Sequence, residues 1–253
     1  MVFLYFFSTF AQLLTDDIMV IIGKETEKEQ ITQAIKELWG LLTEEQQHFL
    51  LQNTVVEKYK KNELIYHEGG TPEYLFCLAK GKVKIFKKGI GGRPQIVRMA
   101  KLEGFFGYRA GFASDQYTTS ASAFENATVC KIPLPVIQKI LHKNNDVAIY
   151  FIRQLANLLG HADEQTVNLT QKHIRGRLAE ALLRLKNQYG MEDDGKTLAI
   201  SISREDLANL SNMTTSNAIR TLSSFATEAL IAIDGRRIQL LEEDKLHKIS
   251  KNG

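Results

Sequence analysis

The sequence predicts an α+β protein with three successive parts: an antiparallel β-roll or barrel, a long helix and a winged helix-turn-helix. Short apolar runs separated by glycine-bearing turns fill residues 54–133. Apolar residues recur at alternating spacings of four and three from about residue 145 to 169. Two capped helical patterns with an Asn between them, followed by a hairpin signal, fill residues 203–241.

The composition is that of an ordered protein. The 253 residues are 44% hydrophobic and 24% charged, with a formal net charge of +3. Because the basic surplus is small, charge alone does not establish nucleic-acid binding. Cys77 and Cys130 lie far apart in apolar stretches, so we expect buried, reduced thiols in a cytoplasmic protein. No P-loop, nucleophile elbow or paired-histidine motif occurs, so we predict neither an enzyme nor a metal site.

Residues 1–27 form an apolar N-terminal extension that admits three interpretations. Met1 to Leu14 is nearly all apolar but shorter than the roughly 20 residues that span a bilayer. It reflects an upstream start codon with Met19 as the natural start, a helix docked on the protein, or a weak membrane-surface contact. We favour the first two, because nothing else in the chain is typical of a membrane protein.

Residues 28–144 are expected to form the roll with its flanking helices. Lys28 to Gln52 has helical spacing, and Thr43 heads a capping box. Glycine supplies the positive φ that tight turns demand between the strands that follow. The expected strands lie within residues 73–81, 82–88, 93–100, 118–124 and 127–133.

Residues 145–170 are expected to form a long dimerisation helix, because its apolar residues make one narrow seam that matches a two-stranded coiled coil. A helix packed only on its own roll is the alternative, since Phe151, Leu158 and Val167 widen the apolar face. We favour the dimer. The seam residues expected to meet a second chain are Ile152, Leu155, Leu159, Ala162 and Thr166.

Residues 171–253 are expected to form the winged helix-turn-helix. A polar, basic hinge over residues 171–175 precedes a helix over 177–189 that Gly190 ends, and then a strand over 197–202. Ser203 caps the first helix of the motif, Asn212 lies at its turn, and Met213 plugs the corner.

The second helix of the motif has two contrasting faces. Thr214 caps it, and Ala218, Leu222 and Phe225 share its apolar face. Its other face is short-chained and polar apart from Arg220, which suits close approach to base edges in a major groove. The polar face consists of Ser216, Arg220 and Ser223.

Asp234-Gly235 between two apolar runs predicts a hairpin with Arg236 and Arg237 at its tip, near DNA phosphates. Helix-turn-helix geometry also occurs outside DNA-binding proteins, and a charged hairpin tip is often only solvated. The ordered set of features nevertheless favours DNA. The predicted DNA-binding residues are Arg204, Thr214, Thr215, Ser216, Asn217, Arg220, Ser223, Arg236 and Arg237.

Three stretches resemble the Crp/Fnr family of bacterial regulators, which includes the catabolite activator protein. They are GGTPEYLFCLAKGKVKIF, EGFFGYRAGF, and ISREDLANLSNMTTSNAIRTLSSF with the IDGRRIQL wing, and the resemblance extends from about Leu41 to Leu241. It implies a jelly-roll-like double-stranded β-helix that binds a small effector, a homodimer built on the long helix, a palindromic double-stranded DNA operator and RNA polymerase as a partner. Arg220 matches the family's central recognition Arg, but Thr215 and Ser216 replace the Arg and Glu of the catabolite activator, so a different half-site should follow.

The resemblance also implies where the effector site lies, and there the sequence departs from the members that bind cyclic AMP. Gly107 matches their Gly, but Tyr108 replaces the ribose-binding Glu, and Tyr117 or Thr118 replaces the phosphate-binding Arg, whose charge-assisted bond is worth roughly 1.5–3 kcal/mol. Arg109 is either a replacement anion partner or a structural ion pair. The predicted effector-binding residues are Phe106, Gly107, Tyr108, Arg109, Ala110, Tyr117, Thr118 and Thr119.

We therefore predict a homodimeric, sequence-specific DNA-binding transcription regulator gated by a small effector other than ordinary cyclic AMP. The cysteine cluster of the iron–sulfur branch is missing, haem binding through one His stays open, and no cofactor is identifiable. The alternative is a cyclic-nucleotide-binding module that acts on a protein partner. Constitutive activity without an effector is a third possibility. The effector, the operator and the direction of regulation stay open.

Overall fold

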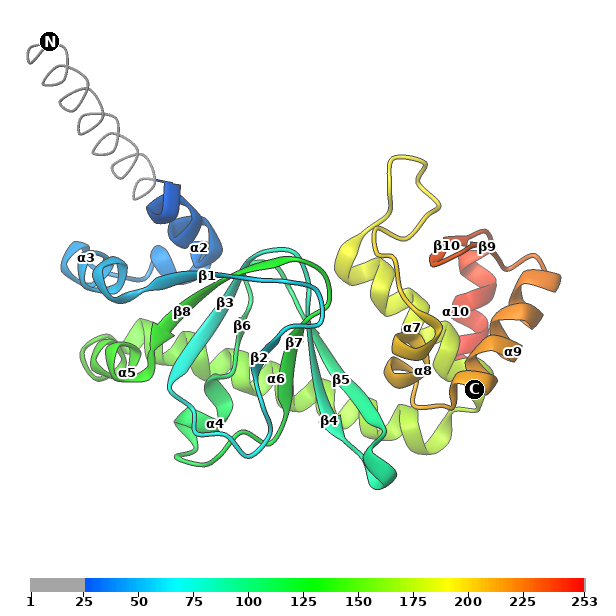
Figure 1. Ribbon diagram of the computed structural model, residues 1–253, viewed down its shortest axis with the longest axis horizontal. Helices are drawn as coiled ribbons and strands as arrows, with labels where there is room; N and C mark the ends of the chain where they lie inside the picture. Colours follow the sequence, from blue (N-terminus) through cyan, green and yellow to red (C-terminus); the bar gives the residue numbers. More distant parts are fainter. Residues whose placement is uncertain (1–25, 253) are drawn as a thin grey trace, which may run out of the picture. The chain divides into compact units, whose positions relative to one another are not determined.

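The computed structural model describes residues 26–252 (Figure 1). The interpretations of the apolar N-terminal extension therefore fall outside the described residues, apart from residues 26 and 27. The described chain divides into two compact units. One contains residues 26–83 and 100–151, and the other contains residues 84–99 and 152–252.

The first unit begins with helices where the sequence predicted a helical pattern. A helical segment over residues 26–34 is followed by α2 (Lys36–Trp39) and α3 (Glu44–Asn53). The predicted capping box is confirmed, because the Thr43 Oγ1 accepts from the Gln46 amide at 3.3 Å and the Gln46 Oε1 accepts from the Thr43 amide at 3.1 Å. This new start interrupts the helical pattern, so several short helices replace one long one.

The strands of the first unit are antiparallel, as predicted. One sheet has the order β1-β8-β3-β6, and β2 pairs with β7 outside it. Cys77 and Cys130 lie directly opposite one another in neighbouring strands, both free and buried. Burial raises the pKa of both thiols, that of Cys130 to about 12. The strands are β1 (Val55–Tyr59), β2 (Leu64–Tyr66), β3 (Tyr74–Lys80), β6 (Phe105–Phe106), β7 (Ser120–Ala123) and β8 (Ala127–Pro133).

Three helices complete the first unit: α4 (Tyr108–Phe112), α5 (Leu134–Lys143) and the start of α6 (Asn145–Gln171). The Asn144 Oδ1 accepts from the Val147 amide at 3.2 Å and so caps the start of α6. Phe151 is buried with its ring 5.4–5.5 Å from the rings of Phe105, Tyr108 and Phe112. This aromatic cluster anchors the first two turns of α6.

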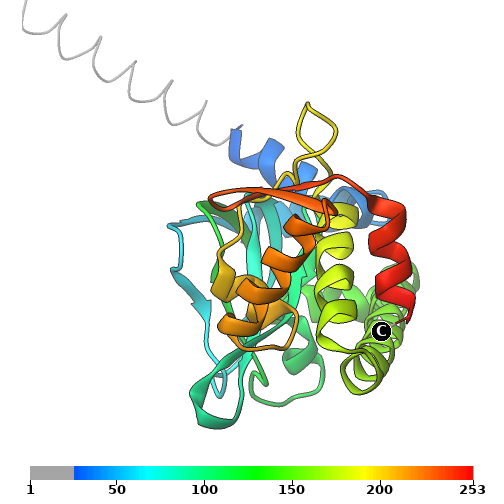
Figure 2. The same ribbon diagram turned by 90° about the vertical axis from the view of Figure 1, so that its right-hand side faces the viewer.

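The second unit begins inside β4 and holds the rest of α6 and the C-terminal part of the chain. Among its helices, α7 starts three residues before the predicted position, and Gly190 ends it with φ at 75°. The C-terminal helix α10 was not predicted, and it lies beside α7 (Figure 2). The elements are β4 (Val83–Lys88), a 3-10 turn (Ile90–Gly92), β5 (Pro94–Ala100), α7 (Ile174–Tyr189), α8 (Arg204–Leu210), α9 (Thr215–Thr227), β9 (Ile231–Asp234), β10 (Arg237–Leu240) and α10 (Glu243–Asn252).

The predicted strand over residues 197–202 is wrong. Its alternating apolar residues Leu198, Ile200 and Ile202 are buried, as the pattern indicated. However, the amide of Leu198 bonds the Ile238 carbonyl while that of Ala199 bonds the Gly190 carbonyl. Because the segment divides its backbone hydrogen bonds between two partners, it forms isolated bridges rather than a ladder. The alternating pattern predicted correctly which side chains are buried, but it did not predict how the backbone of the segment pairs.

Candidate DNA interface, dimer seam and effector site

The helix-turn-helix forms as its caps predicted. The Ser203 Oγ accepts from the Asp206 amide at 3.0 Å and begins α8, and the Thr214 Oγ1 accepts from the Asn217 amide at 3.2 Å and begins α9. Between the helices, Asn212 adopts the left-handed conformation with φ at 49°, and Met213 is buried in the corner. These local interactions fix where each helix of the motif starts.

Helix α9 has the two faces that its sequence predicted. Ala218, Leu222 and Phe225 are at most 1% exposed, which fixes the helix to the unit behind it. The opposite face is exposed, and there the Arg220 Nη2 donates to the Asn217 Oδ1 at 2.6 Å. This bond orders the Arg220 side chain on the outer face. The exposed polar residues are Thr214, Thr215, Ser216, Arg220 and Ser223, and Asn217 is half-buried.

The wing turns one residue later than predicted. Asp234 pairs with Arg237, so the loop residues are Gly235, with φ at 56°, and Arg236. Glycine takes the first loop position because that position needs a positive φ. Arg236 is exposed at the tip as predicted, whereas Arg237 forms an ion pair with Glu192.

Arg204 joins the first helix of the motif to this tip. Its Nη2 donates to the Gly235 carbonyl at 2.8 Å, while its Nη1 is buried with no hydrogen-bond partner among the described residues. A guanidinium donor that is removed from water and unpaired would gain from an anionic oxygen. Because this donor is buried away from the surface, the role of Arg204 as a phosphate contact stays a prediction.

Sequence reasoning missed two arginines that brace the motif. The Arg177 Nε and Nη2 donate to the carbonyls of Ser211 and Asn212 at 3.2 and 3.3 Å, and its Nη1 donates to the Lys172 carbonyl at 3.1 Å. Arg175 binds the Glu228 carboxylate with two bonds of 2.8 Å. Arg175 and Arg177 near the start of a helix do not reveal in the sequence that they have partners more than 30 residues away.

The predicted dimer seam lies on α6, and most of its residues are exposed. Ile152 and Leu159 are 57% and 65% exposed, Ala162 and Thr166 are exposed, and Leu155 is half-buried. Phe151, one residue before the seam, is instead buried on the roll. Phe151 and the exposed seam residues therefore lie on different sides of the helix, and the dimer stays a prediction.

The predicted effector segment begins with Gly107 at φ 81°, which precedes the short helix α4. Tyr108 is buried, with its ring 5.4 Å from the rings of Phe112 and Phe151, so it belongs to the core. Arg109 is exposed, and no ion-pair partner for it lies among the described residues. The remaining predicted residues divide into buried Phe106, Ala110 and Tyr117, half-buried Thr119 and exposed Thr118.

A stack of four buried rings lies inside the roll beside Gly107. Ring centroids are 4.1 Å apart for Tyr117 and Tyr66, 5.6 Å for Tyr66 and Phe76, and 5.3 Å for Phe76 and Phe106. A Cβ at Gly107 would lie only 2.5 Å from the Phe76 Cδ2. Glycine is therefore required here by the stack, and a ligand bound at this place would have to displace these rings.

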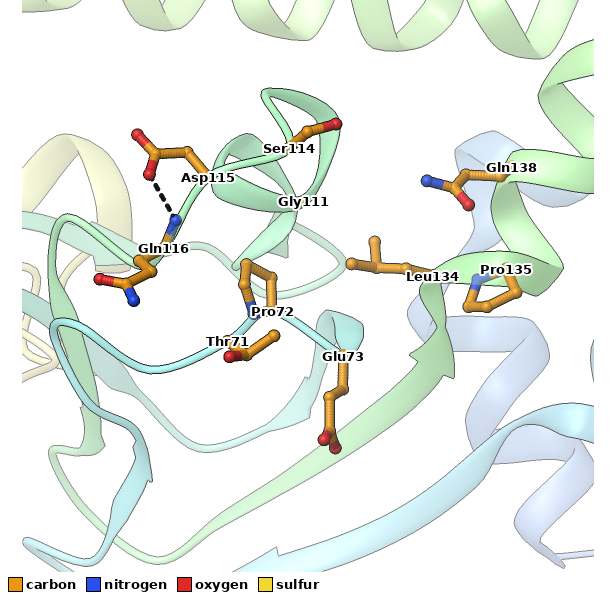
Figure 3. Close-up of a pocket in the computed structure, with 10 residues that line it drawn as sticks. All are labelled: Thr71, Pro72, Glu73, Gly111, Ser114, Asp115, Gln116, Leu134, Pro135 and Gln138. Atoms are coloured by element: carbon orange, nitrogen blue, oxygen red, sulfur yellow. Dashed lines mark hydrogen bonds between the residues drawn. The ribbon is translucent and has the colours of Figure 1, made fainter.

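A separate cavity of about 710 Å³ lies in the first unit (Figure 3). None of the predicted effector residues lines it, although the lining segment 111–116 lies between them in the sequence. The exposed carboxylates of Glu73 and Asp115 stand at its wall and disfavour a phosphate. The lining residues are Thr71, Pro72, Glu73, Gly111, Ser114, Asp115, Gln116, Leu134, Pro135 and Gln138.

Within residues 26–252, no group of three or more His, Cys, Asp or Glu residues could hold a metal ion. No helix in that same range is long and apolar enough to cross a membrane.

Comparison with known proteins finds matches to two regions of the chain. Residues 56–144 match the cyclic nucleotide-binding domain family, and residues 176–249 match the Crp-like helix-turn-helix domain family. The cAMP-activated global transcriptional regulator CRP of Pasteurella multocida is 24% identical over 191 residues, which cover 75% of this chain and 91% of that protein. This chain belongs to the Crp/Fnr family of transcription regulators.

Other relatives of this Crp/Fnr regulator are similar over most of their length. The anaerobic regulatory protein of Bacillus subtilis is 25% identical over 179 residues, which cover 70% of this chain and 75% of that protein. The structure of FixK2 from Bradyrhizobium japonicum has a TM-score of 0.71 and 25% identity, and covers 78% of this chain and 96% of that one. The relatives from Pasteurella multocida and Bacillus subtilis are regulators rather than enzymes, which confirms the predicted class, and the FixK2 structure confirms the predicted fold.

Acid should weaken the brace at the C-terminal end of α9. Hydrogen bonds from Arg175 and then Ser224 lower the pKa of Glu228 from its ordinary value of 4.5 to about 2. A carboxyl whose pKa is lowered by folding stabilises the protein above pH 4.5, and this contribution is lost as the pH falls from 4.5 to 2. Because both side chains of the pair are about 40% exposed and screened by water, this contribution is small. Glu228→Gln should therefore slightly flatten the fall of the unfolding free energy over that range in urea titrations. Arg175→Gln should have the same effect, and an unchanged slope in both variants would contradict the assignment.

Proposed function

We propose that this regulator is a cytoplasmic homodimer that binds a palindromic DNA operator, and that its roll responds to a small effector other than cyclic AMP. The observation that carries the DNA-binding part is the division of α9 into a buried apolar face and an exposed polar face. Short hydroxyl side chains allow the helix to approach base edges closely, and Arg220 is long enough to bond guanine. RNA polymerase is the partner we expect at a promoter.

The proposed contacts fall into two classes. Thr215, Ser216, Arg220 and Ser223 face outward from the middle of α9, where they would contact bases, and Asn217 supports Arg220. Thr214, Arg204 and Arg236 lie at the ends of the motif, where they would contact phosphates. Arg237 is the weakest member of the predicted set, because its ion pair with Glu192 would have to open.

Arg220→Ala should weaken binding to the preferred operator by about 1–3 kcal/mol and relax base preference at one position of each half-site. The operator would be obtained by selection from a random duplex library with the full chain, and binding measured by fluorescence anisotropy. Lys245→Ala, an exposed cation on α10, is the matched control and should change little. Full sequence-specific affinity in Arg220→Ala would count against α9 as the reading helix.

The dimer is proposed from the exposed seam of α6. Ile152 and Leu159 lie seven residues apart, which places them on one stripe of a two-stranded coiled coil. An apolar stripe of this kind gains free energy only when a second surface removes it from water. A second copy of the same helix supplies the matching stripe.

Leu159→Asp should convert the dimer into monomers, because a carboxylate in the centre of the seam would be desolvated opposite its own copy. The mass measured by analytical ultracentrifugation should halve, and affinity for the palindrome should fall. Asn157→Asp, which is exposed on another side of α6, is the control. A dimer that persists at low concentration in Leu159→Asp would refute the seam.

The effector part is supported by the aromatic stack together with the replaced Glu and Arg positions. A nucleotide in the roll would have to separate Tyr66 from Tyr117 and would find no arginine at either family position. The exposed segment around Arg109 and Thr118 stays available to a different molecule. A module that binds cyclic nucleotides and acts on a protein partner is the less favoured alternative.

Cyclic AMP at millimolar concentration should produce no heat of binding in isothermal titration calorimetry and no change in operator affinity, because the charge-assisted partners are missing. A thermal-shift screen of small molecules against the purified protein then separates gating by another effector from constitutive activity. Binding of cyclic AMP at micromolar concentration would overturn the effector proposal and leave the DNA proposal intact.

A further inference from the structure

We propose that Arg175 is a positioning residue that sets the operator half-site spacing, because it clamps the recognition helix α9 to the first turn of α7, directly after the short linker from α6. The inference rests on the proposed function, since half-site spacing has meaning only for a dimer on DNA. It adds a residue outside the DNA-contacting set and a specific role for it.

The clamp is a bidentate contact with supporting bonds. The Arg175 Nη1 donates to the Glu228 Oε1 at 2.8 Å and to the Ser224 Oγ at 2.7 Å, and the Nη2 donates to the Glu228 Oε2 at 2.8 Å. The guanidinium carbon also lies 4.8 Å from the centroid of the Phe225 ring. The planar fork of arginine matches a carboxylate in direction as well as charge, and lysine cannot reproduce this geometry.

The clamp holds the far end of the recognition helix. Glu228 is the C-cap residue of α9, and Arg175 is the second residue of α7, four positions after α6 ends at Gln171. The sequence predicted a hinge over residues 171–175. Arg175 instead ties this segment to the C-terminal end of α9.

The N-terminal end of α9 is tied through Arg177, which lies on the same first turn of α7 and also reaches the linker. This side chain donates to the Lys172 carbonyl in the linker and to the carbonyls of Ser211 and Asn212 in the turn that leads into α9. Two points define the direction of a rod. With both ends tied to one short segment, α9 keeps a set direction relative to that segment, and in a dimer this direction determines the separation of the two recognition helices.

The role differs from simple stabilisation. The side chains of Arg175 and Glu228 are 40% and 44% exposed, and ion pairs this exposed contribute little to global stability. The buried residues Leu222 and Phe225 hold the helix in place without the clamp. Its loss should therefore widen the range of helix directions rather than unfold the unit.

The test uses the selected palindrome and duplexes in which the half-sites lie one or two base pairs closer or farther apart. Wild-type protein should prefer the selected spacing. Arg175→Gln and Glu228→Gln should each lose about 3- to 10-fold in affinity for that spacing and little for the others. The difference in affinity between the selected spacing and the other spacings should therefore become smaller. Arg175→Lys, which keeps the charge without the fork, should behave like Arg175→Gln.

Lys186→Gln provides the matched control, because it breaks an ion pair between α7 and α10 that does not involve α9. It should leave the spacing preference unchanged. The inference is overturned if Arg175→Gln and Glu228→Gln keep the wild-type preference, or if they lose affinity equally at every spacing together with a lower Tm. Wild-type protein that binds no duplex in the selection would refute the proposed function itself, and the inference with it.

Discussion

Presentation of the polar face of α9 depends on the burial of its opposite, apolar face. Ala218, Leu222 and Phe225 lose almost all contact with water, and this leaves the opposite face outward. The caps then fix the start of the helix, and the arginines fix its direction. Phe225 has both roles, because its ring is a core residue and also lies beneath the Arg175 guanidinium. A helix held at this many points can present polar side chains without losing its own order.

Aromatic packing has a corresponding role in the first unit. Phe151 anchors the start of α6 on the roll, and Tyr108, at the position where the cyclic-AMP-binding members have a glutamate, packs against it. The stack beside Gly107 fills the interior that a small ligand would otherwise enter. At Tyr108 the side chain that replaces a polar partner for a nucleotide therefore supplies an apolar contact with the long helix, and at Tyr117 it supplies a stacking contact within the roll.

Local signals in the sequence were sufficient for much of the fold. The caps at Thr43, Ser203 and Thr214 and the left-handed Asn212 depend on residues within three positions, so their motifs could be recognised directly. The exposed seam followed from periodicity. The clamp of Arg175 on Glu228 joins residues 53 positions apart, and the aromatic stack joins four segments, so neither leaves a local pattern. The strand expected over residues 197–202 failed for the same reason, because pairing is decided by distant partners.

In the proposed complex, two copies of α9 read one DNA duplex from the same side. Hydroxyl-radical footprinting of the wild-type protein on its selected operator tests this most directly. Two equally protected patches centred about 34 Å, or one helical turn, apart on one face of the duplex are the predicted result. A single patch, or protection spread evenly along the duplex without a helical repeat, would contradict it.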